Sequence, residues 1–174
     1  IFHNFCIEMT IINMEDLSKI REKYKDKKIV FCSGGFDLTH VGHILFFEDC
    51  KKLGDILVVG VARDVSLKKR KGNDRPILNE HIRIKTIDSI KPVNYVFMSS
   101  SASTKDLLET IQGTFEKLHP DVYAINEDTF DIPLRRNLCV KFKIKMQILH
   151  RSCPKEFDGI STSKIINKIK KLLD

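Results

Sequence analysis

Long hydrophobic runs are absent from this chain of 174 residues. The longest apolar stretch covers residues 56–62. It is far shorter than the roughly 20 residues that span a bilayer as a helix, so we expect no membrane span. The chain also lacks a Cys-x-x-Cys pair, and its five cysteines are odd in number. This usage argues against a disulfide framework and favours free thiols in a cytoplasmic protein.

Internal repeats and low-complexity linkers are absent too. A chain of this length suffices for one domain with a substantial core, and the sequence predicts a single domain over residues 15–174. Residues 1–14 are predicted to be an N-terminal extension. They are fairly apolar, but they lack the basic start and the cleavage site of a signal peptide. An additional strand in this segment is the alternative.

Positive charge exceeds negative charge, with a formal net charge of +7 and a pI of about 9.1. A basic chain favours anionic partners, which include nucleotides, sugar phosphates, nucleic acid and anionic membrane surfaces. The aromatic residues show no pattern of the kind that stacks single-stranded bases. We therefore expect a small-molecule ligand and no nucleic acid partner.

Strand and helix patterns alternate along the whole chain. The run at 55–62 is continuously apolar, as in a strand that helices cover on both faces. Such alternation indicates an α/β fold with a five-stranded parallel sheet between two layers of helices. Residues 63–78 are predicted to be an irregular basic loop. The predicted strands are 28–33, 55–62, 93–98, 121–125 and 142–149, and the predicted helices are 15–24, 42–53, 79–90, 105–118, 132–139 and 161–173.

The segment 29–44, IVFCSGGFDLTHVGHI, holds the strongest functional signal. An apolar strand leads to Gly34 and Gly35, which allow a ligand to approach the backbone closely. His40 and His43 follow at the start of a predicted helix, where free N–H groups and the helix dipole attract anions. Both imidazoles lie on one face of the helix and can contact one phosphate. The alternative, a zinc site, lacks a second cluster of His or Cys to complete four ligands.

The decapeptide GGFDLTHVGH resembles the signature G-x-F-D-x-x-H-x-G-H of the cytidylyltransferase-like nucleotidyltransferases. The resemblance implies a Rossmann-like three-layer sandwich. It also implies catalytic roles for the two histidines. For Asp37 we expect support of the turn, through hydrogen bonds to nearby backbone N–H groups, rather than metal binding. The residues implied to border the nucleotide here are Gly34, Gly35, Phe36, Asp37 and Gly42.

A second resemblance lies at 149–165, LHRSCPKEFDGISTSKI. Family members carry Arg-Thr followed closely by Gly-[Ile/Val]-Ser-Thr-Thr at a helix start, and here the insert 153–158 separates the two parts. Hydroxyls and N–H groups at a helix N-terminus bind phosphate oxygens, and an arginine adds a bidentate contact. A plain N-cap of Ser or Thr is the alternative. The resemblance implies a catalytic role for Arg151 and nucleotide binding by Gly159, Ile160, Ser161, Thr162 and Ser163.

The basic segment 63–83 is similar to the K-R-x-K-G-x-x-R-P-[IV] loop and the N-E-x-E-R motif of the heptose-phosphate adenylyltransferases. This similarity implies a catalytic role for Lys71 and binding roles for Arg75 and Arg83. Ile82 stands where the family carries the acid that helps to hold this last arginine.

Residues 126–128 stand where relatives carry a Gly-Gly-Asp or Gly-Asp-Asp turn that borders the nucleotide. The resemblance therefore implies that Asn126 and Asp128 contact the nucleotide. A solvated acidic turn without a ligand is the alternative.

The family transfers a nucleotidyl group from ATP or CTP to the phosphate of a small-molecule acceptor and releases pyrophosphate. Mg²⁺ on the triphosphate is its expected cofactor. The basic segment favours a heptose-phosphate adenylyltransferase, whereas the GISTSKI turn suits a CTP-dependent enzyme for glycerol 3-phosphate or a phospho-alcohol equally well. A catalytically silent nucleotide- or RNA-binding module is the alternative outside the enzymes. The resemblance also implies a homodimer.

Overall fold

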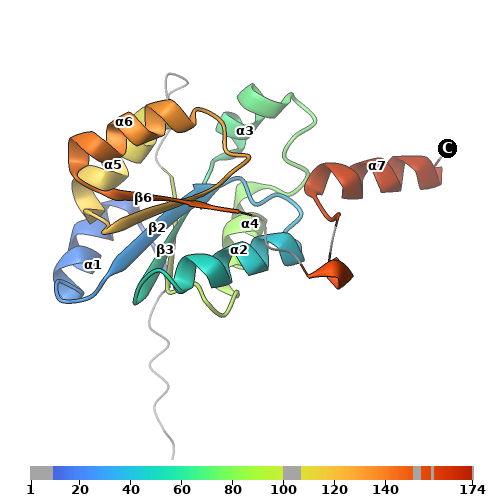
Figure 1. Cartoon of the computed structure of the whole chain (residues 1–174). Coiled ribbons are helices and arrows are strands. Elements are labelled where there is room, and N and C mark those ends of the chain that lie inside the picture. Colours follow the sequence, from blue (N-terminus) through green and yellow to red (C-terminus); the bar gives the residue numbers. More distant parts are fainter. Residues whose placement is uncertain (1–9, 100–106, 151–153, 158, 174) are drawn as a thin grey trace, which may run out of the picture.

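The computed structural model describes residues 10–99, 107–150, 154–157 and 159–173. In this part of the chain, six parallel strands form one sheet in the order β1-β4-β3-β2-β5-β6 (Figure 1). The sequence predicted five strands, because β1 has only two residues and shows no periodicity. β1 lies in the segment predicted to be an extension and pairs with β4. The strands are β1 (Ile11–Ile12), β2 (Ile29–Gly34), β3 (Ile56–Val61), β4 (Tyr95–Met98), β5 (Val122–Asn126) and β6 (Lys145–Leu149).

One helix lies in the segment predicted to be an irregular loop, and that prediction was wrong. α3 begins at Asp64 and ends at Lys71, and only Leu67 within it is buried. It therefore lacks the apolar stripe by which a sequence indicates a helix. The helices are α1 (Leu17–Lys23), α2 (Val41–Lys51), α3 (Asp64–Lys71), α4 (Glu80–Asp88), α5 (Leu107–Leu118), α6 (Ile132–Phe142) and α7 (Thr162–Leu173), with 3₁₀ turns η1 (Met14–Asp16) and η2 (Lys155–Phe157).

The strands direct alternate side chains into two cores, one on each face of the sheet. In β2, Ile29 and Phe31 belong to the core that includes residues of α1, α5 and α6. Val30 and Cys32 belong to the core that includes residues of α2 and α4. Figure 1 shows α5 and α6 on one side of the sheet and α2 on the other. The predicted three-layer α/β sandwich is thus confirmed, and its central strands are apolar throughout because helices cover both faces.

β2 marks the topological switch point of the sheet, because it pairs with β3 on one side and with β5 on the other. Ligands of open α/β sheets bind beyond the carboxyl ends of the strands at such a point. The turn after β2 leads there into α2, the turn after β3 into α3, and the turn after β5 into α6. α7 extends beyond the same edge of the sheet (Figure 1). None of the described helices is long and apolar enough to cross a membrane.

Candidate active site

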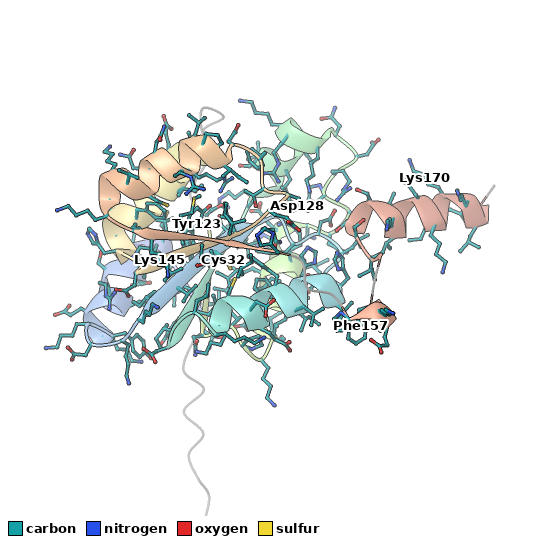
Figure 2. The ribbon with its side chains drawn as sticks, viewed as in Figure 1. Cys32, Tyr123, Asp128, Lys145, Phe157 and Lys170 are labelled. Atoms are coloured by element: carbon teal, nitrogen blue, oxygen red, sulfur yellow. The ribbon has the colours of Figure 1, made fainter. Side chains whose placement is uncertain are left out.

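A cavity of about 370 Å³ is lined by residues at the carboxyl ends of β2, β3 and β5. Figure 2 shows Asp128 at the edge of the sheet nearest α7, away from Lys145 at the start of β6. Arg83, Gly159 and Ile160 are outside the lining, and Arg151 lies outside the described residues. The predicted residues that do line the cavity are Gly34, Gly35, Phe36, Asp37, His40, Gly42, His43, Lys71, Arg75, Asn126, Asp128, Ser161, Thr162 and Ser163.

The two histidines lie together at the start of α2, with ring centroids 4.0 Å apart. His40 is the N-cap residue, and its Nδ1 accepts a hydrogen bond from the N–H of Gly42 at 3.1 Å. The N–H of His40 donates to Nδ1 of His43 at 3.3 Å. Because both Nδ1 atoms accept, each neutral ring carries its proton on Nε2. The backbone thus sets both imidazoles in the tautomer that donates to a ligand through Nε2.

Asp37 is 4% exposed and holds a distant segment in place. Its carboxylate accepts from Nε of Arg75 and from the N–H groups of Ile77 and Leu78, each at 3.0 Å. The sequence predicts hydrogen bonds to nearby N–H groups, but the partners of Asp37 lie some 40 residues further along the chain. Burial raises the pKa of this carboxyl. The N–H groups and the guanidinium outweigh that effect and leave the pKa below its ordinary value.

We expect Asp37→Asn to lower the free energy of unfolding by about 2–3 kcal/mol at neutral pH, because a buried carboxylate with three donors loses its charge. The pKa of Asp37 is lower in the folded than in the unfolded chain. Its contribution is therefore present above the unfolded pKa and lost as the pH falls through the folded pKa. Urea unfolding should give a larger difference between wild type and variant at about pH 7 than at about pH 3. Equal differences at both pH values would contradict this account.

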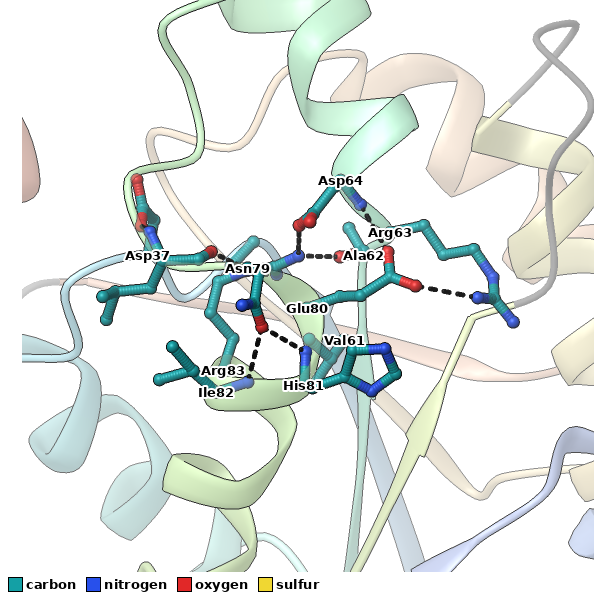
Figure 3. Close-up of polar contacts among 12 residues, drawn as sticks. Asp37, Val61, Ala62, Arg63, Asp64, Asn79, Glu80, His81, Ile82 and Arg83 are labelled. Carbon is teal, nitrogen blue, oxygen red and sulfur yellow. Dashed lines mark hydrogen bonds and ion pairs between the residues drawn. The ribbon is translucent and has the colours of Figure 1, made fainter.

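Arg83 is fully buried and lies outside the cavity. Its Nε donates to the carbonyl of Leu78 at 3.0 Å, and its Nη1 donates to the carbonyl of Gly35 at 2.6 Å. Its Nη2 donates to the carbonyl of Ala62 and to the carboxylate of Asp64, both at 2.7 Å (Figure 3). The family carries an acid directly before this arginine, and here Asp64 of α3 supplies the carboxylate instead. The arginine therefore joins the turns after β2 and β3 to α4.

Further polar contacts fix the starts of α3 and α4 beside Arg83 (Figure 3). Asn79 caps α4, since its Oδ1 accepts from the N–H groups of His81 and Ile82 at 3.1 and 3.0 Å. Glu80 accepts from the N–H of Asp64 at 2.8 Å and from Nη1 of Arg63 at 3.0 Å. These bonds orient α3, which carries a run of four basic residues in its last turn.

The start of α7 faces the same cavity as the start of α2. Thr162 donates through Oγ1 to the carbonyl of Asp37 at 2.8 Å, which holds α7 against the turn after β2. Oγ of Ser161 accepts from the N–H of Lys164 at 3.2 Å, so this serine serves as a helix cap. Two helix N-termini therefore converge on one space, and each favours an anion there.

Positive charge is concentrated where α3 ends. Burial lowers the pKa of Lys71, and so do the charges of Arg70 and Arg75, whereas Asp37 and Asp128 act in the opposite direction. An ammonium group among cations gains stability from an anionic ligand. The cavity thus combines two ring donors, two helix N-termini and a partly buried cationic cluster, an arrangement suited to a polyphosphate.

Part of the lining was not singled out in the sequence. The only signal for Arg135 is its spacing of four residues from Cys139, which places a charged side chain on the buried face of α6. Isolated Ser, Thr and Phe residues carry no such signal, because they are common in any core. The lining residues without a motif include Phe31, Ser33, Phe97, Thr110, Ile111, Thr114, Phe130 and Arg135.

Comparisons with known sequences place the chain in a family. The model of the cytidylyltransferase-like family matches residues 31–168. Bifunctional protein HldE of Helicobacter acinonychis (strain Sheeba) is 35% identical over 162 residues, which are 92% of this chain and 31% of HldE. HldE of Campylobacter jejuni (strain RM1221) is 34% identical over 170 residues, 97% of this chain and 33% of that protein. The chain thus spans about a third of the length of these relatives.

Solved structures agree with this assignment. The lipopolysaccharide core biosynthesis protein of Thermoplasma volcanium is 30% identical, with a TM-score of 0.58, and the match covers 74% of this chain and 99% of that protein. Pantoate-beta-alanine ligase of Francisella tularensis shares the fold at 17% identity, with a TM-score of 0.64 over 95% of this chain and 79% of that one. The chain belongs to the cytidylyltransferase-like family of nucleotidyltransferases.

Proposed function

We propose that the chain transfers the adenylyl group of ATP to the phosphate of a heptose. One observation carries this proposal: His40 and His43 are held as Nε2 donors in a cavity that α7 and Lys71 also border. The HldE relatives and the resemblance of segment 63–83 to the heptose-phosphate adenylyltransferases support the choice of ATP and of a sugar phosphate. CTP with glycerol 3-phosphate or a phospho-alcohol is the second candidate, supported by the GISTSKI turn.

In the proposed reaction an oxygen of the acceptor phosphate attacks the α-phosphorus of the triphosphate. The new P–O bond forms as the bond to pyrophosphate breaks, and pyrophosphate leaves with the electron pair. The attacking phosphate is already an anion, so the protein needs no covalent intermediate. It has to place two anions and to stabilise the charge that develops between them.

The described residues divide this task among them. His40 and His43 donate through Nε2 to the α-phosphate and the leaving group, and Lys71 offsets negative charge. The N–H groups at the start of α7 hold the terminal phosphates, because the hydroxyl of Thr162 is already bonded to the carbonyl of Asp37. Arg151 keeps its predicted role as a further phosphate contact. Arg83 and Asp37 act as positioning residues, which hold the turns that carry the binding groups.

Mg²⁺ is the expected cofactor, and it neutralises charge on the triphosphate when bound. Among the described residues, no group of three or more His, Cys, Asp or Glu side chains is arranged to hold a metal ion. The carboxylates in the described lining are those of Asp37 and Asp128, and Asp37 is already bonded to Arg75 and two N–H groups. The site therefore fits a Mg²⁺ that would be held mainly by phosphate oxygens and water.

The resemblance also supports a homodimer. Buried free thiols at Cys32, Cys50 and Cys139 support a location in the reducing cytoplasm.

The proposal is tested by pyrophosphate release with Mg²⁺ and either ATP or CTP. The acceptors are heptose 1-phosphate, glycerol 3-phosphate, phosphocholine and phosphoethanolamine. We expect ATP with heptose 1-phosphate to give the strongest signal. A strong signal only with CTP would establish the second candidate. Silence with every pair, together with RNA binding that falls steeply with salt, would overturn the proposal in favour of a binding module.

Gly42, which lies between the two histidines in the sequence, allows a test of how closely the position of the His40 ring controls the rate. A Cβ at this position would lie 3.0 Å from Cε1 and 3.1 Å from Nδ1 of His40, which is closer than ordinary van der Waals contact. We expect Gly42→Ala to displace the His40 ring and to lower kcat about tenfold, since small misplacements of catalytic groups are costly. The control is Gly113→Ala in α5, which lies outside the cavity lining and where a Cβ would meet only the flexible end of the Met14 side chain, at 3.2 Å. A Gly42→Ala variant with the kcat of the wild type would show that the position of His40 is not critical.

A further inference from the structure

Two arginines contact one aromatic ring at the edge of the cavity. The Cζ atom of Arg70 lies 4.6 Å from the centroid of the Phe130 ring, and the Cζ atom of Arg135 lies 4.8 Å from it. Arg70 comes from the last turn of α3, whereas Arg135 comes from the first turn of α6. All three residues line the cavity. Arg70 belongs to the basic segment 63–83, whereas no motif covers Phe130 or Arg135, and the mechanism proposed above uses none of the three.

Arg135 is only 3% exposed, and the protein fixes its guanidinium in place. Nε donates to the carbonyl of Phe130 at 2.9 Å, and Nη1 donates to the hydroxyl of Tyr123. Tyr123 is itself fully buried, and it lies in β5, next to the edge strand β6. These bonds leave Nη2 as the nitrogen that a ligand can contact. A rigid donor at a cavity wall loses little entropy when it binds a ligand.

The charges of the two arginines are not compensated within the described residues. The arginine ion pairs there involve Arg21, Arg63, Arg75 and Arg83, and neither Arg70 nor Arg135 takes part in one. Burial lowers the pKa of Arg70, and the charge of Arg135 lowers it further. Arg135 is buried whereas Arg70 is exposed, and buried charges in proteins are normally paired, because desolvation without a partner is costly. An anionic group of a ligand would relieve both the desolvation and the repulsion.

The cavity wall beside this pair includes Phe31, whose ring stacks on that of Tyr123, the residue to which Arg135 donates. The lining also contains the aromatic ring of Phe97 and the hydroxyl-bearing side chains of Ser33, Thr110 and Thr114. Apolar faces accept the C–H groups of a sugar or polyol, and side-chain hydroxyls can pair with its hydroxyl groups. The triphosphate already has the two helix N-termini and Lys71. This part of the cavity is therefore suited to the acceptor.

We propose that Arg70 and Arg135 bind a phosphate of the acceptor and make the site selective for phosphorylated sugars or polyols. The proposal rests on the proposed function, because it assigns the second substrate of the same reaction. The phosphate is either the one that attacks or a second one at the other end of the acceptor. Phe130 links the two arginines, because the guanidinium groups of both lie over its ring, with Cζ atoms 4.6 and 4.8 Å from the centroid.

The kinetic test compares Arg70→Gln and Arg135→Gln with matched controls. Lys68→Gln removes an exposed charge from α3, and Arg136→Gln removes one from α6 beside Arg135. We expect each arginine variant to raise the KM for the acceptor at least tenfold and to leave the KM for ATP within twofold. The controls should change neither constant. A rise in the KM for ATP alone, or unchanged constants in both arginine variants, would overturn the proposal.

Loss of folding is separated from loss of binding by a conservative variant. Arg135→Lys keeps the charge but not the planar donors. We expect it to restore part of the acceptor affinity that Arg135→Gln loses. If Arg135→Gln fails to fold, Arg70→Gln still decides the question, because the bonds to Phe130 and Tyr123 come from Arg135 and stay in place. An Arg70→Gln variant with an unchanged KM for the acceptor would overturn the proposal.

The two sources of the phosphate are distinguished by the acceptor. Hexose 1-phosphate and hexose 1,6-bisphosphate are compared as substrates of wild type and variants. If the arginines hold the attacking phosphate, the variants lose affinity for both compounds. If they hold a second phosphate, the variants lose affinity only for the bisphosphate, which the wild type should then prefer. Equal losses of kcat with unchanged KM for both compounds would contradict either form.

A binding experiment remains informative even if no nucleotidyl transfer is detected. The 20.1 kDa chain is labelled with ¹⁵N-arginine, and inorganic phosphate is added without nucleotide. We expect the Nε–H signals of Arg70 and Arg135, which are assigned from the two Gln variants, to shift with a common saturation curve. The Nε–H signal of Arg21, whose guanidinium is occupied by Asp121, serves as the internal control. If the Nε–H signals of Arg70 and Arg135 did not shift with added phosphate, the proposal would be overturned, whether or not the chain shows nucleotidyl transfer.

Discussion

His43→Ala is expected to lower the rate of pyrophosphate release by about 10³-fold or more while the fold stays intact. Loss of one preorganised donor to a developing oxyanion typically costs 10²–10³-fold in rate. His43 has a second role, because its Nδ1 accepts the N–H of His40, the N-cap residue of α2. The substitution therefore removes one donor and loosens the other. Steady-state pyrophosphate release, together with circular dichroism of the variant, measures the effect.

His81→Ala is the matched control for this experiment. His81 is exposed on α4 and is absent from the cavity lining, so its loss should leave kcat unchanged. His43→Gln adds information, because its side-chain amide keeps an N–H donor, and we expect a smaller loss than with alanine. If His43→Ala kept more than about a tenth of the wild-type rate, the histidine pair would not be the catalytic centre.

Arg83→Met is expected to lower the free energy of unfolding by about 4 kcal/mol, which is the largest effect on stability that we predict. The methionine occupies a similar volume, but it leaves three carbonyls and the carboxylate of Asp64 without their donor. Buried acceptors without a partner each carry a desolvation cost. Urea unfolding followed by circular dichroism measures the change.

Arg63→Met is the control, since Arg63 belongs to the same network but forms a partly exposed ion pair with Glu80. We expect it to cost no more than about 1 kcal/mol. Similar losses of unfolding free energy in the two variants would show that the burial of Arg83 does not make its hydrogen bonds more stabilising than an exposed ion pair. An active and stable Arg83→Met variant would contradict the positioning role that we assign to this residue.

The fold was largely predictable because its central strands are continuously apolar and alternate with amphipathic helices. β1 and α3 were not predicted for one physical reason. A strand or helix shows a periodic pattern of apolar residues only where it buries one face, and these two elements bury few side chains. β1 has two residues, and its pairing with β4 depends on a strand more than 80 residues away. α3 buries only Leu67, and Asp64 in its first turn is fixed from outside the helix, because its N–H donates to Glu80 and its carboxylate accepts from Arg83.

The site was predictable where chemistry is local in sequence. The turn after β2, the end of α3 and the start of α7 each carry several binding groups within a few residues, and the structure brings them to one cavity. Arg83 shows the limit of such motifs: its side chain is aligned with a site motif, yet its guanidinium is bonded to three backbone carbonyls and to Asp64. Arg135 is the reverse case, a cavity residue that no motif indicates. A single arginine on a helix becomes a candidate ligand contact only when the structure places it against Phe130, together with Arg70.

The central claim is nucleotidyl transfer, and the fate of a labelled phosphorus atom tests it most directly. The chain is incubated with Mg²⁺, heptose 1-phosphate and ATP labelled with ³²P at either the α- or the γ-position. We predict that the α-label appears in a product joined to the acceptor by a diphosphate bond and that the γ-label appears in pyrophosphate. A γ-label on the acceptor would mean phosphoryl transfer, and an α-label found only in free AMP would mean hydrolysis. Either result would contradict the account.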